Sequence, residues 1–254
     1  MKHSSRSTQH DALLYGYHAV TEAVRAGRRE IRKILLARDK QAARAEKITA
    51  LADEAGIQVD LVSQQALDTL VGHGRHQGLA AEVSAYPFVR LEALVQNADQ
   101  PPLLLILDQI VDPQNLGAMA RTAQCTGAGG IIITRDRSAQ PTAAVSKASA
   151  GAIEHLPVAG VTNLAKTLQS LKKEGLWIAG ADRHGEVELF KADFSGALAI
   201  VIGGEEKGLR PLVRKHCDFT VAIPQIGPLG SLNASAAAAV LLYEAFRQRR
   251  HPKG

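Results

Sequence analysis

One short segment constrains the fold of this chain more than any other. Residues Leu103–Asp108 read Leu-Leu-Leu-Ile-Leu-Asp, and they follow the pair Pro101-Pro102. A strand with one face in water alternates apolar and polar residues, whereas this run stays apolar until its last residue, so both of its faces should be buried. Strands of this kind are typical of parallel sheets covered by helices on both sides. The segment therefore predicts an α/β protein with a parallel sheet.

The residues after this strand continue the pattern. Asp112-Pro113 is a typical helix start, and the predicted helix runs from Pro113 to about Thr126, where Gly127 ends it. A strand at Gly130–Thr134 then completes one βαβ unit. The same patterns predict further strands at Glu154–Val158, Trp177–Ala181, Ala197–Ile202 and Phe219–Ile223, and a closing alanine-rich helix from about Asn233 to Arg249.

A shorter alternation of helices and strands precedes this region. Helices are predicted at His18–Ala26, Gln41–Ala55 and Gln65–Val71, and strands at Ile31–Ala37, Gln58–Val62 and Gly78–Ser84. Three prolines and one short helix around Leu91–Gln96 mark a linker. The predicted organisation is a disordered tail at 1–12, a small α/β/α domain at 13–86, a linker at 87–102 and a larger α/β domain at 103–250.

Composition narrows the class of protein. The 254 residues include 30 Lys and Arg against 25 Asp and Glu, and this net charge of +5 suits a polyanionic partner without identifying one. The two cysteines, Cys125 and Cys217, complete no zinc ligand set and no disulfide framework, which fits a reducing cytoplasm without a metal site. No apolar run approaches a membrane span, and the first residues lack an apolar signal region. We expect a cytoplasmic protein.

Three polar loops follow the ends of predicted strands. In parallel α/β sheets ligands bind beyond the carboxyl ends of the strands, so these loops are the candidate site. They comprise residues 108–117, which run into Arg121, residues 203–209 and residues 223–235.

Each loop taken singly also has a purely structural interpretation. Asp112-Pro113 suits an N-cap with a first-turn proline, Gly203-Gly204 a tight turn, and Ser231 or Asn233 a cap for the last helix. Phosphate binding is a further alternative for a glycine-rich loop, but Glu205 and Glu206 would repel phosphate. Neither a dinucleotide fingerprint nor a P-loop is present, which argues against a nicotinamide-dependent oxidoreductase or an NTPase.

Taken together and in order, the three loops resemble the three motifs of the SpoU (TrmH) family of RNA ribose methyltransferases. The matching residues are Asn115-Leu116-Gly117 with Arg121, then Gly203-x-Glu205-x-x-Gly208, then Ile223-Pro224 before Ser231-Leu232-Asn233-x-Ser235. This resemblance covers residues 103 to 250. Tyr15-Gly16-x-His18 and His76-Gln77-Gly78 resemble the family's amino-terminal substrate-binding domain, which is of a ribosomal-protein L30-like type. Within the family the chain is similar to the subgroup that methylates a guanosine of 23S ribosomal RNA.

The resemblance implies a fold and a chemistry that the pattern of residues does not reveal. It implies a parallel sheet whose carboxyl-terminal segment threads a deep trefoil knot of the SPOUT type, and a homodimer. It also implies transfer of a methyl group from S-adenosylmethionine to a ribose 2′ hydroxyl. By this resemblance Gly203, Ile223 and Leu232 would bind the cofactor, and the catalytic set would be Asn115, Arg121, Glu205, Ser231 and Asn233.

The role of Arg121 needs a physical interpretation. The resemblance implies that it activates the ribose hydroxyl, yet a guanidinium keeps its proton to a pKa above about 12. Our hypothesis is that Arg121 stays charged, grips the target phosphate and stabilises the developing alkoxide, while another group or water takes the proton. A second arginine, Arg75, lies in the glycine-rich stretch 72–78, which is either a phosphate clamp or a solvated hairpin.

Two other functions remain open at this point. One is 2′-O-methylation of tRNA instead of ribosomal RNA. The other is a non-catalytic RNA-binding or ribosome-assembly factor that keeps the fold, although all three motif loops are present in this sequence.

Overall fold

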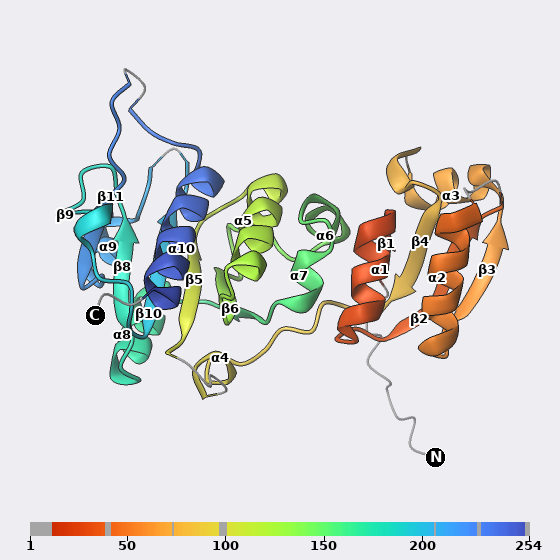
Figure 1. Ribbon diagram of the computed structural model, residues 1–254, viewed down its shortest axis with the longest axis horizontal. Coiled ribbons are helices and arrows are strands. Elements are labelled where there is room, and N and C mark those ends of the chain that lie inside the picture. Colours follow the sequence, from red (N-terminus) through yellow and green to blue (C-terminus); the bar gives the residue numbers. More distant parts are fainter. Residues whose placement is uncertain are drawn as a thin grey trace, which may run out of the picture. The chain divides into compact units, whose positions relative to one another are not determined.

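The computed structural model describes residues 12–38, 42–72, 74–96, 101–205, 207–227 and 230–251. The predicted tail at 1–12 lies outside these ranges except for Ala12. The chain divides into two compact units, and the chain passes from one to the other more than once. The first unit contains the residues up to Pro87 together with Thr142–His155, and the second contains Phe88–Pro141 and the residues from Leu156 onward. Each unit has its own sheet (Figure 1).

The first unit is built on a sheet with the strand order β1-β4-β2-β3 in its described part. The strands are β1 (Ala12–Tyr15), β2 (Ile31–Ala37), β3 (Gln58–Val62) and β4 (Leu79–Val83), and the helices between them are α1 (Tyr17–Ala26), α2 (Ala42–Glu54) and α3 (Gln64–Val71). Alternate residues of β2 divide between two apolar clusters: Ile34 and Leu36 pack with α1 and α2, whereas Leu35 packs with Leu67 of α3. Period-two alternation thus buries both faces of the sheet.

A segment from the second half of the sequence completes this unit. It forms α6 (Ala143–Ala148) and α7 (Ala152–His155). Glu154 of α7 and Arg29 are both almost fully buried, and they form a bidentate ion pair with N–O distances of 2.7 and 3.1 Å. Gly151 permits a close approach to α1, because a Cβ there would lie 2.5 Å from the Cβ of Glu22 and 2.7 Å from the carbonyl oxygen of His18.

Tyr86 extends the contact between this segment and the rest of the unit. Its hydroxyl donates to the carbonyl oxygen of Ile153 at 3.0 Å, and its ring lies 4.9 Å from the guanidinium of Arg29. Burial raises the pKa of Tyr86 to about 12, so the hydroxyl stays protonated and remains a donor at neutral pH. The Tyr86 ring therefore covers the Arg29 side of the buried ion pair, and the Tyr86 hydroxyl holds the ring against α7.

The second unit contains the predicted parallel sheet, with the strand order β7-β6-β5-β10-β8-β11-β9 in the described ranges. All of its recorded pairings are parallel. The strands are β5 (Leu103–Asp108), β6 (Gly130–Thr134), β7 (Val158–Val161), β8 (Trp177–Ala181), β9 (Val187–Glu188), β10 (Leu198–Gly203) and β11 (Phe219–Ala222).

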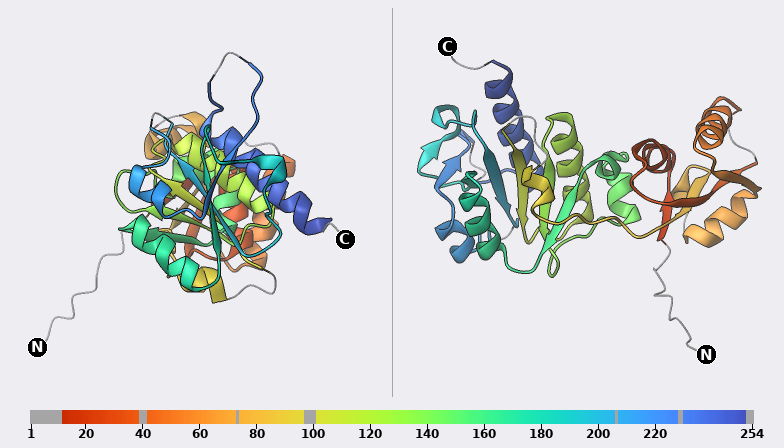
Figure 2. Two further views of the ribbon diagram at one scale, coloured as in Figure 1. Left: turned by 90° about the vertical axis from the view of Figure 1, so that its left-hand side faces the viewer. Right: turned by 90° about the horizontal axis from the view of Figure 1, so that it is seen from below.

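Helices cover both faces of this sheet (Figure 2). Leu104 and Ile106 of β5 pack in one cluster with α4 (Ala93–Gln96), α8 (Leu164–Lys173) and α9 (Pro211–Lys215). The opposite face is covered by α5 (Pro113–Cys125) and α10 (Ala234–Arg250), which also contact each other. Every residue of β5 is buried, which confirms the prediction that both of its faces lie inside the protein.

Most predicted elements agree with the structure to within two residues, but one strand is wrong. Residues Glu154–Val158 do not form a strand: α7 ends at His155, and the strand begins only at Val158. The physical reason is Glu154, whose carboxylate is buried against Arg29 instead of lying on a sheet face. The sequence also missed β1 and β9, which are short strands of four and two residues.

The predicted domain boundaries differ from the two units in two respects. The predicted linker at 87–102 belongs to the second unit from Phe88 onward, and its helix α4 packs in that unit's core. The predicted domain at 103–250 is continuous, whereas Thr142–His155 packs with the first unit. Among the described residues, no helix is long and apolar enough to cross a bilayer.

Removing the Glu154 carboxylate should destabilise the first unit strongly. Glu154→Ala leaves the Arg29 charge buried without its partner, and we expect the free energy of unfolding to fall by about 3–5 kcal/mol. Urea denaturation followed by circular dichroism measures this change. Glu54→Ala, at an exposed position of α2, is the control and should change stability by less than about 0.5 kcal/mol. The double variant Arg29→Met/Glu154→Met should recover much of the loss. A Glu154→Ala variant as stable as the control would show that the buried ion pair does not stabilise this unit.

Candidate functional site

The parallel sheet brings the three motif loops to one edge. β10 pairs with both β5 and β8, and β8 pairs with β11, so the carboxyl ends of these four strands are neighbours. The loops that follow β5, β10 and β11 therefore lie at the same edge, as expected for a ligand site in this class of sheet. The loop after β8 lies there as well, although the sequence analysis did not single it out.

A buried carboxylate fixes the loop that follows β10. Asp108, at the end of β5, is fully buried and accepts hydrogen bonds from the backbone N–H of Arg210 at 3.0 Å and from its Nε at 2.7 Å. Within this loop the N–H of Gly208 donates to the carbonyl of Gly204 at 2.8 Å. A Cβ on Gly203 would lie 2.1 Å from the carbonyl carbon of Gly208, so glycine is required where the loop folds back on itself.

One amide joins the three motif loops. The side-chain nitrogen of Asn115, in the first turn of α5, donates to the carboxylate of Glu205. The Asn115 oxygen accepts from the side-chain nitrogen of Asn233 at 3.1 Å. Asn233 is also the N-cap of α10, because its oxygen accepts from the backbone N–H of Ser235 at 2.9 Å. The structure thus brings Asn115, Glu205 and Asn233 into one hydrogen-bond chain, and Asn233 also fulfils the capping interpretation.

Arg121 and Ser231 are not part of this chain of hydrogen bonds. Arg121 lies on the exposed side of α5, roughly 120° around the helix axis from Asn115 and about 9 Å further along it. Within the described ranges no hydrogen bond or ion pair links Arg121 to Asn115, Glu205 or Asn233. Ser231 is exposed and lines the cavity described next.

A cavity of about 480 Å³ opens among the loops. Gly203, Ile223 and Leu232, the predicted cofactor-binding residues, all line it, together with Glu205 and Ser231. Its volume lies within the range of small-molecule sites. Its wall combines apolar side chains such as Ile202 with charged groups of both signs.

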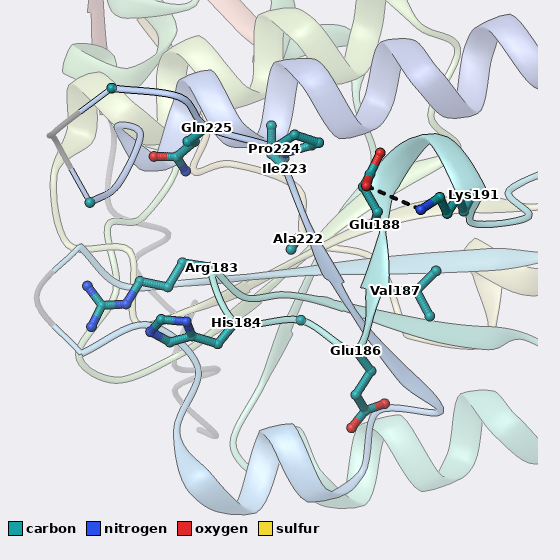
Figure 3. A pocket seen from close by; sticks show the side chains of 13 residues that line it. Arg183, His184, Glu186, Val187, Glu188, Lys191, Ala222, Ile223, Pro224 and Gln225 are labelled. Carbon is teal, nitrogen blue, oxygen red and sulfur yellow. Dashed lines mark ion pairs between the residues drawn. The ribbon is translucent and has the colours of Figure 1, made fainter.

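The loop after β8 supplies residues that the sequence analysis missed. Asp182, Arg183 and His184 line the same cavity, and Asp182 forms an ion pair with Arg214. The signal was available, since this loop also follows the carboxyl end of a parallel strand. Arg183, His184 and Gln225 also line a neighbouring hollow of about 720 Å³, which extends toward the Glu188–Lys191 ion pair (Figure 3).

The described residues contain no candidate set of metal ligands. No group of three or more His, Cys, Asp or Glu side chains is positioned there to hold a metal ion. Burial raises the pKa of the Cys217 thiol to about 12, so this thiol stays protonated at neutral pH.

Replacing the shared amide with a carboxylate should open the site. Asn115→Asp removes the donor to Glu205 and sets two carboxylates against each other. We expect faster amide hydrogen exchange in residues 203–209 and in the first turn of α10, measured by mass spectrometry. The matched control is Asn163→Asp, because the Asn163 side-chain oxygen caps α8 by accepting from the N–H of Lys166, a role that aspartate keeps. Unchanged exchange in the site of Asn115→Asp would show that the hydrogen-bond chain does not hold the loops.

Comparison with known proteins agrees with the architecture of both units. The profile described as the SpoU rRNA Methylase family matches residues 102–243, and the profile described as RNA 2'-O ribose methyltransferase substrate binding matches residues 13–89. The 23S rRNA (guanosine-2'-O-)-methyltransferase RlmB of Pseudomonas syringae pv. tomato is 41% identical over 239 residues, which cover 93% of this chain and 95% of that protein.

Two solved structures extend the comparison. The SpoU methyltransferase AviRb from Streptomyces viridochromogenes, in complex with the cofactor AdoMet, superposes with a TM-score of 0.80 at 25% identity, covering 96% of this chain and 92% of that chain. A second structure, solved in a study of the 2-OH methylation of C/U34 on tRNA, matches with a TM-score of 0.53 at 31% identity. The match covers 58% of this chain and 97% of that chain. The first profile alone spans more than half of the sequence. The chain therefore belongs to the SpoU rRNA methylase family.

Proposed function

We propose that this protein methylates the ribose 2′ hydroxyl of a specific guanosine in 23S ribosomal RNA, with S-adenosylmethionine as the methyl donor. The observation that carries this proposal is the convergence of the motif loops on one cavity, where Gly203, Ile223 and Leu232 lie beside Glu205 and Ser231. The identity of 41% to RlmB along nearly the full chain supports the choice of ribosomal RNA.

The cavity fits this cofactor in size and in chemistry. The apolar side chains of Ile223 and Leu232 suit an adenosine, whereas the mixed charges of Lys207, Glu205 and Arg183 suit the zwitterionic amino-acid end. We propose that Gly203, Ile223 and Leu232 hold it largely through backbone groups. When bound, S-adenosylmethionine supplies a sulfonium methyl group as the electrophile.

The residues of this chain then have to position and activate the ribose. A ribose hydroxyl is a weak nucleophile until its proton is drawn away, and a charged Arg121 cannot act as the base. We assign to Arg121 the binding of the target phosphate and the stabilisation of the developing alkoxide. We further assign to Asn115, Glu205 and Asn233 the alignment of the loops, which their hydrogen bonds support, and to Ser231, in the cavity wall, a contact with the substrates.

The finer features of the architecture belong to the same proposal. We propose that residues 13–86 form an L30-like RNA substrate-binding domain, that 87–102 link it to a methyltransferase domain at 103–250, and that the carboxyl-terminal segment of that domain threads a trefoil knot. The position of β10 between β5 and β8 and the return of α10 onto α5 support such a path. A ribosomal RNA substrate also supports a cytoplasmic location.

We further propose that the protein works as a homodimer through α10. Phe190, Val240 and Tyr243 are exposed by 61, 38 and 51% and line one groove with Phe246 and Arg247. Apolar side chains gathered in this way mark an interface, and a second copy of the chain is the occupant that we propose.

The alternatives are 2′-O-methylation of tRNA and a non-catalytic role in ribosome assembly. The tRNA-related structure corresponds to 58% of this chain, whereas RlmB corresponds to 93%, which favours the ribosomal substrate. An assembly factor would have no use for a complete set of motif loops.

The reaction itself is tested with labelled cofactor. The purified protein should transfer the label to 23S rRNA from a strain that lacks the gene, and the product should contain an alkali-resistant dinucleotide whose first residue is 2′-O-methylguanosine. Transfer to bulk tRNA instead would support the first alternative, and no transfer to either RNA would support the second. Asn163→Asp serves as a fully active control.

Arg121→Lys tests the role of the guanidinium. A lysine keeps the charge but loses the bidentate geometry, so we expect kcat/KM for RNA to fall by at least about 100-fold while the Kd for S-adenosylmethionine stays unchanged. Steady-state kinetics and calorimetry measure the two quantities. Turnover near the wild-type value would mean that the fork-shaped guanidinium is dispensable.

A charge placed in the apolar groove tests the homodimer. Tyr243→Glu should convert the protein to a monomer, because an unpaired carboxylate would be buried in the interface. Size-exclusion chromatography with light scattering gives the mass directly. Lys166→Glu on α8, an exposed position outside the groove, should leave the mass unchanged. A monomeric wild-type protein would overturn this part of the proposal.

A further inference from the structure

Two tyrosines at the start of the first unit are each paired with a cation. The Nζ of Lys147 lies 5.3 Å from the ring centroid of Tyr15, and the guanidinium carbon of Arg44 lies 5.3 Å from that of Tyr17. Only Gly16 separates the two tyrosines in the sequence, where β1 ends and α1 begins, although Tyr15 packs against the cluster that contains Leu67 and Tyr17 against the cluster of α1 and α2. Arg44 comes from α2 and Lys147 from α6, so elements far apart in the sequence supply the cations of these two pairs.

A third cation adjoins this surface. The Nζ of Lys147 donates to the backbone carbonyl of Arg75, in the short 3-10 turn Gly74–His76. Partial burial and the nearby charge of Arg75 lower the pKa of Lys147, so two like charges are held close together. Two neighbouring positive charges favour the binding of an anion such as a phosphate beside them.

The turn that carries Arg75 is fixed by the residue that follows it. The ring of His76 is fully buried; its Nδ1 accepts from the N–H of Gly78 at 2.9 Å, and its Nε2 donates to Asp68 at 2.9 Å. Gln77 in turn accepts from the N–H of Tyr17 at 3.1 Å, which ties the turn to the start of α1. Residues 74–78 therefore form a positioned turn with an exposed arginine, which favours the phosphate-clamp interpretation over a solvated hairpin.

We infer that Tyr15, Tyr17, Arg44, Arg75 and Lys147, here called the tyrosine–cation surface, bind the RNA substrate. This inference rests on the proposed function and names the residues through which the first unit would act. The three cations would contact phosphates, and the Arg44 guanidinium, which lies over the Tyr17 ring, offers a plane on which an unpaired base stacks. An acidic protein would match the charges but would make no use of a guanidinium held over an aromatic ring.

Lys147 belongs to this surface although it lies far along the sequence from the other four residues. It lies in the stretch that matches the SpoU rRNA Methylase profile, at 102–243, yet it packs in the first unit. The sequence match to the substrate-binding profile, at 13–89, therefore does not include all of the RNA-binding side chains that we infer.

The test measures binding of the full-length protein to deproteinised 23S rRNA from a strain lacking the gene, at several salt concentrations. Lys147→Gln and Arg44→Gln should each raise the Kd about five- to tenfold, and each should reduce the slope of log Kd against log salt by about one, because one phosphate contact is lost. The KM for RNA should rise in parallel, while the Kd for S-adenosylmethionine stays at the wild-type value. Lys33→Gln, on β2 of the same unit, is the charge-matched control and should bind like the wild type.

Two outcomes overturn the inference. One is wild-type Kd and salt slope in both variants, and the other is an equal loss in Lys33→Gln, which would indicate a merely general charge effect. Circular dichroism melting identifies a variant that has lost its fold, and the exposed Arg44→Gln keeps the test valid if Lys147→Gln unfolds. A wild-type protein that binds RNA through this surface but transfers no methyl group would refute the proposed function and leave the inference standing.

Discussion

The burial of β5 on both faces is the constraint from which the rest of the second unit follows. A strand without a solvent face needs neighbours on both sides and helices above and below, which parallel pairing with crossover helices supplies. Parallel pairing then places every carboxyl strand end at one edge, so the loops after β5, β8, β10 and β11 have to meet there. The site is thus a consequence of the sheet, and its polar residues occur where the apolar runs stop.

Much of this could be predicted from the sequence, because local patterns determine it. The bounds of β5, β6 and β8 follow from apolar runs, and Asp112 and Asn233 mark their helix starts by capping chemistry. Glu154 shows where local patterns fail. Its neighbours are apolar enough for a strand, but the carboxylate is buried by a partner 125 residues away, and no local pattern reports such a pairing.

The residues of the candidate site also differ in how far the sequence predicts them. The motif order identifies the loops, and their parallel strands explain why Asn115, Glu205 and Asn233 meet. The orientation of Arg121 relative to them depends on the helix it lies on, and within one chain it faces away from their hydrogen-bond chain. Its catalytic role remains a prediction. The loop after β8 was missed because Asp182, Arg183 and His184 form no motif, although their place in the fold brings them to the cavity.

The packing of Thr142–His155 into the first unit has a consequence for how the chain is made. The sequence up to Pro87 emerges from the ribosome first, but it then contains the Arg29 guanidinium without the carboxylate that neutralises it and the Tyr86 hydroxyl without its acceptor. Those partners are synthesised only after β5, α5 and β6 have emerged. The apolar clusters of the first unit come almost wholly from residues before Pro87, so they can form early, but its buried ion pair closes only after the chain has been made as far as Glu154. Completion of the first unit therefore waits for synthesis of part of the second, despite their separate sheets.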